Sequence, residues 1–524
     1  MVITSPLSAN RQIARAAGTI MAAFVLSNLT GLFRQILILR AFGTENVLDA
    51  FNAASTYTDL LFSLIAGGAL ASAFVPTFTA FLARDERKNA WLLASALINL
   101  VLLILCLTSL VSLFFSRQLV GTILAPKFSP SLQDLTASLL RILLIAPAIF
   151  GVSGLLMGIL NAHQVFIWPA LAPTMYWLGM IAGVLFLTPS MGIYGLAWGA
   201  VLGAGMHLLV QVPAVLKLPA RRFILTLGLR FSPVAQVARL MAPRLLGVAA
   251  VQINFVVNTI LATGQPEGSL TAIKSAWAVM TMPQVVIAQA IAIAALPTFS
   301  AQAARGELVQ MRHSLAGTLR GVIFLSLPAS IGLVLLRGPI VSLLFERGKF
   351  DPHSSQLVAW ALLWYAAGLV GHSLVEIVSR AFYALQDTKT PVLVGAAAMS
   401  LNVLFSLVFS AFFDRVGWMP HGGLALANSL ATTLEMAVLL YLMRRRLDGL
   451  EGKLLLSGSA QAVLATLVMS LALGLWLGWS HDLSAWVTGG IGVVVGGAVY
   501  AAGILVLRVP EARELLSLLP MRKH

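Results

Sequence analysis

Apolar residues follow one another in runs of about 20 along almost the whole chain, with short polar connections between them. A helix of that length crosses the hydrocarbon core of a bilayer, so each run predicts a membrane-spanning α-helix. No stretch remains that could form a large soluble domain. We therefore expect an all-α polytopic membrane protein of about fourteen transmembrane helices. The predicted spans are 16–40, 49–80, 91–115, 135–160, 167–187, 192–216, 236–263, 270–299, 313–337, 354–385, 391–413, 421–443, 456–479 and 484–507.

An internal repeat organises these spans. The segment FVPTFTAFLARDE at 74–86 is matched by ALPTFSAQAARGE at 295–307, and NAHQVFIWPAL at 161–171 is matched by YALQDTKTPVL at 383–393. An even number of predicted spans separates the copies, so both have the same orientation. The repeat predicts two parallel six-helix lobes, an arrangement in which transporters bind substrate between their halves.

The repeat and the remaining spans together suggest a division of the chain. The last two spans lie outside the repeat. The expected parts are an N-terminal lobe at 1–216, a C-terminal lobe at 217–450, and a terminal helix pair with a cytoplasmic tail at 451–524.

Composition agrees with the membrane assignment. Hydrophobic residues make up 59% of the chain and charged residues only 10%, against roughly 25% charged in soluble domains. The net charge of +15 does not predict nucleic-acid binding, because the basic residues are spread among the connections between spans. Alternate connections hold most of them, which places both termini in the cytoplasm by the positive-inside rule.

The stretch from Leu26 to Pro76 combines two predicted spans with Arg34, Asp49 and Asp59. Charges at bilayer depth generally mark an aqueous cavity or a polar ligand. For Arg34 the alternative is an arginine that extends to the outer interface. For Asp59, near the middle of its span, the alternative is a structural partner of Arg34 or Lys274.

Other polar residues in the spans have structural alternatives too. Lys274 lies early in the eighth span, in the repeat copy of the second. Glu376 and Arg380 are spaced i, i+4, so they can pair on one helix face. Glu376 and Asp59 are also the carboxylates we would test for coupling to an ion. Asn254 and Asn258 share a face, where hydrogen bonds between helices or a cation site would explain them equally well.

No motif indicates an enzyme. We find no HExxH, paired CxxC, Walker A or nucleophile-elbow pattern, so we expect no catalytic residues, no cofactor and no metal site. The single cysteine, Cys106, excludes an intrachain disulfide. GxxxG spacings at Gly154/Gly158 and Gly199/Gly203 predict close contacts between helices.

A series of short motifs resembles the MurJ/MviN family, whose members are lipid II flippases of the multidrug/oligosaccharidyl-lipid/polysaccharide exporter superfamily. The resemblance covers essentially the whole chain. The motifs are FRQ around Arg34, RAFG at 40–43, DAF at 49–51, GALASAFVPTF at 68–78, LLFERGKFD at 343–351 and RAFYALQDTKTPV at 380–392.

The resemblance implies a function. Such a protein moves an undecaprenyl-pyrophosphate-linked peptidoglycan precursor across the bacterial plasma (inner) membrane by alternating access between two lobes. It further implies contact with membrane lipids, a monomer, and cell-wall synthesis proteins as partners. The two terminal helices would help to form a groove for the polyprenyl tail.

The resemblance also implies a basic substrate site, which this chain matches only in part. Arginine suits a pyrophosphate because its planar fork matches phosphate oxygens. Arg34 matches the family pattern, and Asp49 retains the acidic residue of the DAF motif. An expected arginine falls on Asn28, and another falls one turn from Lys274. A third falls on Phe62 or Ser63, and Gln35 replaces an acidic residue.

The expected substrate-binding residues are therefore Arg34, Lys274, Asp59, Asn28 and Asp49. Two alternatives to a lipid II flippase remain open at this point. One is an exporter of another lipid-linked oligosaccharide or a drug, and the other is a transport-inactive membrane scaffold.

Overall fold

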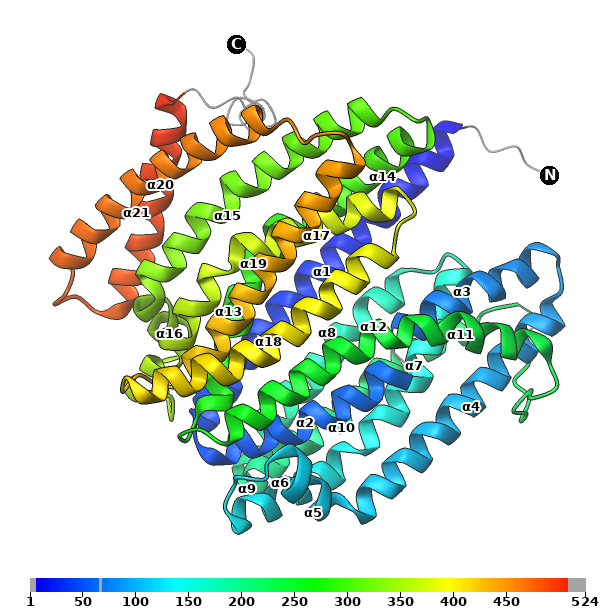
Figure 1. Ribbon diagram of the computed structural model, residues 1–524. Helices are drawn as coiled ribbons and strands as arrows, with labels where there is room; N and C mark the ends of the chain where they lie inside the picture. The colour runs from blue at the N-terminus through cyan, green and yellow to red at the C-terminus, as the bar shows by residue number, and fades with distance from the viewer. Residues whose placement is uncertain (1–5, 66–67, 220, 508–524) are drawn as a thin grey trace. The chain divides into compact units, whose positions relative to one another are not determined.

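The computed structural model describes the backbone of residues 6–65, 68–219 and 221–507. Within these ranges the regular structure is entirely helical (Figure 1). Hydrocarbon offers no partner for backbone N–H and C=O groups, and an α-helix satisfies them internally. The predicted all-α polytopic membrane fold is confirmed. The chain divides into two compact units, Met1–Glu267 and Gly268–His524.

The first unit is a bundle whose core lies between α3, α4, α7 and α12. Phe74 and Phe78 of α3 are fully buried there and stack obliquely on each other. Its helices are α1 (Pro6–Phe42), α2 (Asn46–Ile65), α3 (Gly68–Ala83), α4 (Arg87–Phe114), α5 (Ser116–Leu119), α6 (Pro130–Leu143), α7 (Ile145–Ala162), α8 (Ile167–Ala182), α9 (Thr188–Met191), α10 (Ile193–Leu209), α11 (Val212–Leu216) and α12 (Ser232–Thr263).

The second unit is built around α15, which packs against α16, α17, α20 and α21. The last two helices lie side by side against α15 (Figure 1), where the Tyr500 hydroxyl donates to the Phe324 carbonyl at 2.6 Å. Its helices are α13 (Ser269–Gln284), α14 (Ala290–Ala304), α15 (Leu308–Phe345), α16 (Pro352–Ala367), α17 (Leu369–Ala384), α18 (Lys389–Arg415), α19 (His421–Arg446), α20 (Gly452–Trp479) and α21 (Ala485–Val506).

The helices of the structure can be compared with the fourteen predicted spans. Eleven helical segments of the described residues are long and apolar enough to cross a membrane. The pair α16 and α17, bent by 45° at Gly368, makes a twelfth if it counts as one span. The predicted spans 49–80 and 236–263 overlap the shorter apolar helices Ala73–Ala83 and Val251–Thr263, respectively.

The internal repeat reappears in the backbone. Glu86 begins α4 and Glu307 begins α15, with φ and ψ of −85° and 55° in one and −81° and 58° in the other. In the second matched pair of segments, Gln164 and Gln386 both have a φ of 60°. Left-handed backbone is uncommon outside glycine, so its recurrence at matched positions shows that the two copies share local geometry as well as sequence.

Glycines allow α8 and α10 to approach each other closely, as the spacing of Gly199 and Gly203 predicts. A Cβ added at Gly179 of α8 would lie 2.2 Å from the Gly203 Cα. A Cβ added at Gly183 would lie 2.4 Å from the Gly199 Cα. In a membrane such contacts replace the hydrophobic driving force that joins helices in water. The contact of α8 with α10 therefore depends on the absence of side chains at both surfaces.

We expect Gly179→Val to destabilise the protein, because its side chain would overlap the backbone of α10. Overpacking a tight contact costs about 1–3 kcal/mol or more, so the thermal unfolding midpoint of the purified protein in detergent should fall. Gly205→Ala is the matched control, since a Cβ at Gly205 of α10 meets no atom within 4 Å. Equal midpoints for Gly179→Val and wild type would contradict the proposed packing role.

Candidate functional site

Arg34 lies where α1 packs against α8 in the first unit. Gly31 and Arg34 are one helical turn apart, and both face Trp177 of α8. A Cβ at Gly31 would be 3.4 Å from the Trp177 Nε1, so glycine leaves room for the indole. The guanidinium carbon of Arg34 sits 4.2 Å from the centre of the indole ring, which is a cation–π contact.

The Arg34 guanidinium has few polar partners. Its Nη2 donates to the Gln35 side-chain oxygen at 3.1 Å, and Nη1 lies 3.8 Å from the Met180 sulfur. Its Nε is buried without a protein acceptor. Tyr176 and Asp59 lie within electrostatic range. An arginine held by an aromatic ring, with donors left over, can offer those donors to an anion.

The other predicted residues of the first unit have different surroundings. Asp59 on α2 is exposed, and its electrostatic interaction with Arg34 agrees with a structural pairing. Asp49 is only 3% exposed, in the first turn of α2. Asn28 is exposed on α1, and its amide donates to the Phe24 carbonyl at 2.8 Å. Thus Arg34 and Asp59 come close together in this unit, whereas Asn28 bonds to its own helix.

Glu376 and Arg380 form the ion pair that their spacing predicts. The Arg380 Nη2 lies 2.7 Å from the Glu376 Oε1, and the side chains are 32% and 25% exposed respectively. Tyr383, one turn further along α17, interacts electrostatically with both and with Glu435 of α19. Lys274 is a half-buried residue on α13 of this second unit.

Glu435 was missed by the sequence analysis. A Cβ added at Gly395 of α18 would lie 3.2 Å from its Oε1, so the glycine accommodates the carboxylate between α18 and α19. The signal was available, because Glu435 is a single acidic residue within the apolar span 421–443.

A buried polar network in the first unit was missed as well. The Ser153 hydroxyl of α7 lies 2.7 Å from the His207 Nδ1 of α10, and the Gln211 amide donates to the same hydroxyl at 2.7 Å. Ser153 and Gln211 are fully buried. Polar side chains hydrogen-bond across packed membrane helices in this way, so the network joins α7 to α10.

Comparison with known proteins decides the family. The model of the family described as "Lipid II flippase MurJ" matches residues 38–493. The chain belongs to the MurJ lipid II flippase family. The members of this family are transporters and not enzymes. The resemblance seen in the motifs is thereby confirmed.

Individual MurJ relatives match over most of their length. A lipid II flippase MurJ of Burkholderia cenocepacia is 30% identical over 438 residues, which cover 82% of this chain and 84% of that protein. A probable lipid II flippase MurJ of Vibrio cholerae is 28% identical, over 96% of this chain and 98% of its own. This chain is therefore a multi-pass membrane protein with bacterial relatives.

Solved structures show the same fold. A lipid II flippase MurJ in an inward closed conformation matches with a TM-score of 0.80 at 23% identity, covering 95% of this chain and 99% of that one. An inward-facing multidrug resistance transporter of the MATE family matches with a TM-score of 0.66 at 16% identity, over 81% and 96%. Both have the exporter-superfamily fold.

Two motifs that carry the MurJ resemblance have structural roles in the second unit. Asp351 begins α16 as its N-cap and accepts the Ser354 N–H at 2.8 Å, which holds the pKa of this carboxyl below its usual value. Burial raises the pKa of Asp387, but hydrogen bonds from Thr390 and Arg446 outweigh burial and lower it. Asp351 therefore caps the start of α16, and Asp387 links the start of α18 to the end of α19.

A double-mutant cycle tests the Glu376–Arg380 pair. Glu376→Gln and Arg380→Gln should each destabilise the protein, and the coupling between them should be about 0.5–1 kcal/mol, as for partly exposed ion pairs. Thermal or denaturant unfolding in detergent measures it. The exposed pair Arg87–Asp85 is the control, with an expected coupling near zero. Zero coupling between Glu376 and Arg380 would show that Glu376 is not committed to a structural pair.

Proposed function

We propose that this protein translocates lipid II across the bacterial plasma membrane by alternating access, with both termini in the cytoplasm. The match of the MurJ family model to residues 38–493 carries this proposal. The distribution of Lys and Arg among the connections supports the orientation. The bound substrate is the lipid-linked precursor itself, and the protein acts as a monomer beside membrane lipids and cell-wall synthesis proteins.

Arg34 is the proposed contact for the pyrophosphate. Its guanidinium keeps its charge in any environment, and its indole contact fixes its position without using its hydrogen-bond donors. A buried Nε without a protein acceptor supports this role. Lys274, Asp49 and Asn28 complete the proposed substrate-binding set, and Asp59 modulates the charge near Arg34.

The proposal also concerns the driving force for transport, which is an ion gradient or the membrane potential acting on a carboxylate. An ionisable group that moves in the membrane potential gains about 2.3 kcal/mol per elementary charge per 100 mV. Asp59 is exposed and is the first carboxylate to test for ion coupling. Glu376 is the second, and its pairing with Arg380 means that coupling there would require the pair to separate.

Growth of bacteria depleted of their own lipid II flippase tests this function. Wild type should restore growth and outer-leaflet lipid II. Arg34→Ala should reduce both, because a charge-assisted hydrogen bond contributes about 1.5–3 kcal/mol, or at least a tenfold loss of affinity. Arg40→Ala is the matched control, since Arg40 is exposed near the end of the same helix.

The outcomes separate the alternatives. Wild type that inserts normally yet fails to restore growth would contradict the lipid II proposal. Export of a neutral or cationic compound that is insensitive to Arg34→Ala would instead indicate the drug or oligosaccharide exporter. A scaffold predicts that neither Arg34→Ala nor Lys274→Ala changes any phenotype.

A further inference from the structure

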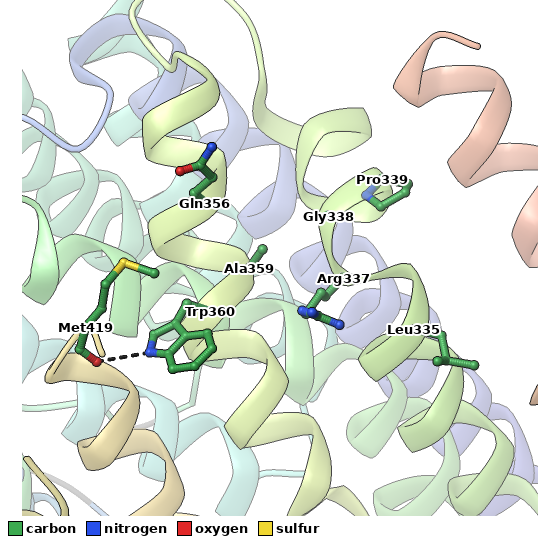
Figure 2. A pocket seen from close by; sticks show the side chains of 8 residues that line it. All are labelled: Leu335, Arg337, Gly338, Pro339, Gln356, Ala359, Trp360 and Met419. Atoms are coloured by element: carbon green, nitrogen blue, oxygen red, sulfur yellow. Dashed lines mark hydrogen bonds between the residues drawn. The ribbon is translucent and has the colours of Figure 1, made fainter. Parts of the chain in front are cut away.

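A pocket in the second unit lies apart from every residue assigned above. It opens where the last turns of α15 meet α16 and the connection between α18 and α19 (Figure 2), and its volume is about 420 Å³. Volumes of roughly 300–1,000 Å³ are typical of small-molecule sites. The lining residues are Leu335, Arg337, Gly338, Pro339, Gln356, Ala359, Trp360 and Met419.

Gly338 and Pro339 form part of the pocket wall that α15 contributes. A Cβ added at Gly338 would meet no atom within 4 Å, so this position borders open space. Pro339 lies inside the helix and has no N–H, which leaves the Leu335 carbonyl without its usual i+4 donor. This part of the wall therefore has little side-chain bulk at Gly338.

Trp360 provides a rigid aromatic wall on the side of α16. Its Nε1 donates to the Met419 carbonyl at 3.0 Å, as Figure 2 shows. Trp364 and Trp418 pack edge-on against it, each with a centroid distance of 5.6 Å. An indole held by a hydrogen bond and two neighbours presents a fixed surface to a ligand, with little entropy to lose on binding.

Arg337 supplies the charge. Its guanidinium is directed from α15 toward Ala359 and Trp360 (Figure 2), and its Nη1 donates to the Val334 carbonyl at 2.6 Å. That bond orients the guanidinium while its other nitrogens have no acceptor among the described residues. Gln356, one turn before Trp360, adds an exposed amide. None of the eight lining residues is acidic, so nothing in the lining neutralises the cation.

We propose that this pocket binds a phosphate-type oxyanion. The Arg337 fork is the charged contact, because its geometry matches two phosphate oxygens. The Gln356 amide is a second donor, and Trp360 and Leu335 cover the organic group that carries the phosphate. The chemistry fits the phosphate of a lipid headgroup and that of a soluble phosphate ester alike.

The position of the pocket favours a lipid headgroup as the source. The α15 segment is a candidate membrane span, and Arg337 lies eight residues before its end at Phe345. Tryptophan and arginine are common where spans meet the headgroup region. This site is independent of the proposed transport function, since it uses no residue of the Arg34 site.

Binding measurements on the full-length purified protein test the proposal without any transport step. One arm titrates sn-glycerol 3-phosphate by calorimetry in detergent. The other compares retained phosphatidylglycerol by native mass spectrometry after reconstitution in nanodiscs that also contain phosphatidylcholine. Arg337→Gln should weaken binding at least tenfold, or about 1.4 kcal/mol. Arg415→Gln, an exposed arginine at the end of α18 outside the pocket, should leave it unchanged.

A second variant keeps the charge and fills the space. Gly338→Leu places a side chain in the open volume beside Arg337, so it should also reduce binding at least tenfold. If Arg337→Gln fails to fold, binding by Gly338→Leu tests the phosphate-site proposal instead. An effect of the variants in both arms identifies a general phosphate site, and an effect with phosphatidylglycerol alone identifies a lipid site. Wild-type binding by the correctly folded variants in both arms, or an equal loss in Arg415→Gln, would overturn the proposal.

Discussion

Hydrocarbon cannot hydrogen-bond, and this constraint governs both the helices of this protein and the polar groups between them. Most backbone amides are satisfied within their own helix, so the helices associate through packing and through contacts between side chains. At α8 and α10 the packing is extreme, because the glycines bring the two backbones into contact. That contact positions α8, and Trp177 of α8 makes the cation–π contact with Arg34.

The polar groups inside the bundle follow the same rule. Ser153, His207 and Gln211 hydrogen-bond to one another between α7 and α10, and Glu376 pairs with Arg380 along α17. The main neighbour of Arg34 is an aromatic ring, and its Nε has no protein acceptor. A half-buried cation that the protein satisfies incompletely is the arrangement expected for a group that meets a charged ligand.

Arg34 and Arg337 show two uses of one residue type. Trp177 lies over the Arg34 guanidinium, and Trp360 lines the same pocket as Arg337. Gly31 lies near the first arginine, and Gly338 with Pro339 lies near the second. The first lies within a unit of a transporter fold, and the second lines an open pocket near the end of a span. Both are proposed phosphate contacts, which would give two separate parts of the chain a role with phosphate-bearing lipids.

The sequence alone determined the membrane fold, the family and one ion pair. Apolar run length predicted the membrane fold, because a bilayer sets the length of a helix that crosses it. The motif series predicted the family, and helical spacing predicted the Glu376–Arg380 pair, since residues four apart share a face. The repeat matched Gln164 with Gln386 in sequence, and the two residues share a left-handed φ of 60°.

Only the tertiary structure decided which residues from different helices meet. Trp177 lies far from Arg34 in the chain, and no periodicity links them; α1 must pack against α8 before the cation reaches the indole. The same holds for Ser153 with His207 and for the pocket around Arg337, whose walls come from three separate segments. Spacing along one helix specifies a face, but contact between faces depends on the packing of the whole bundle.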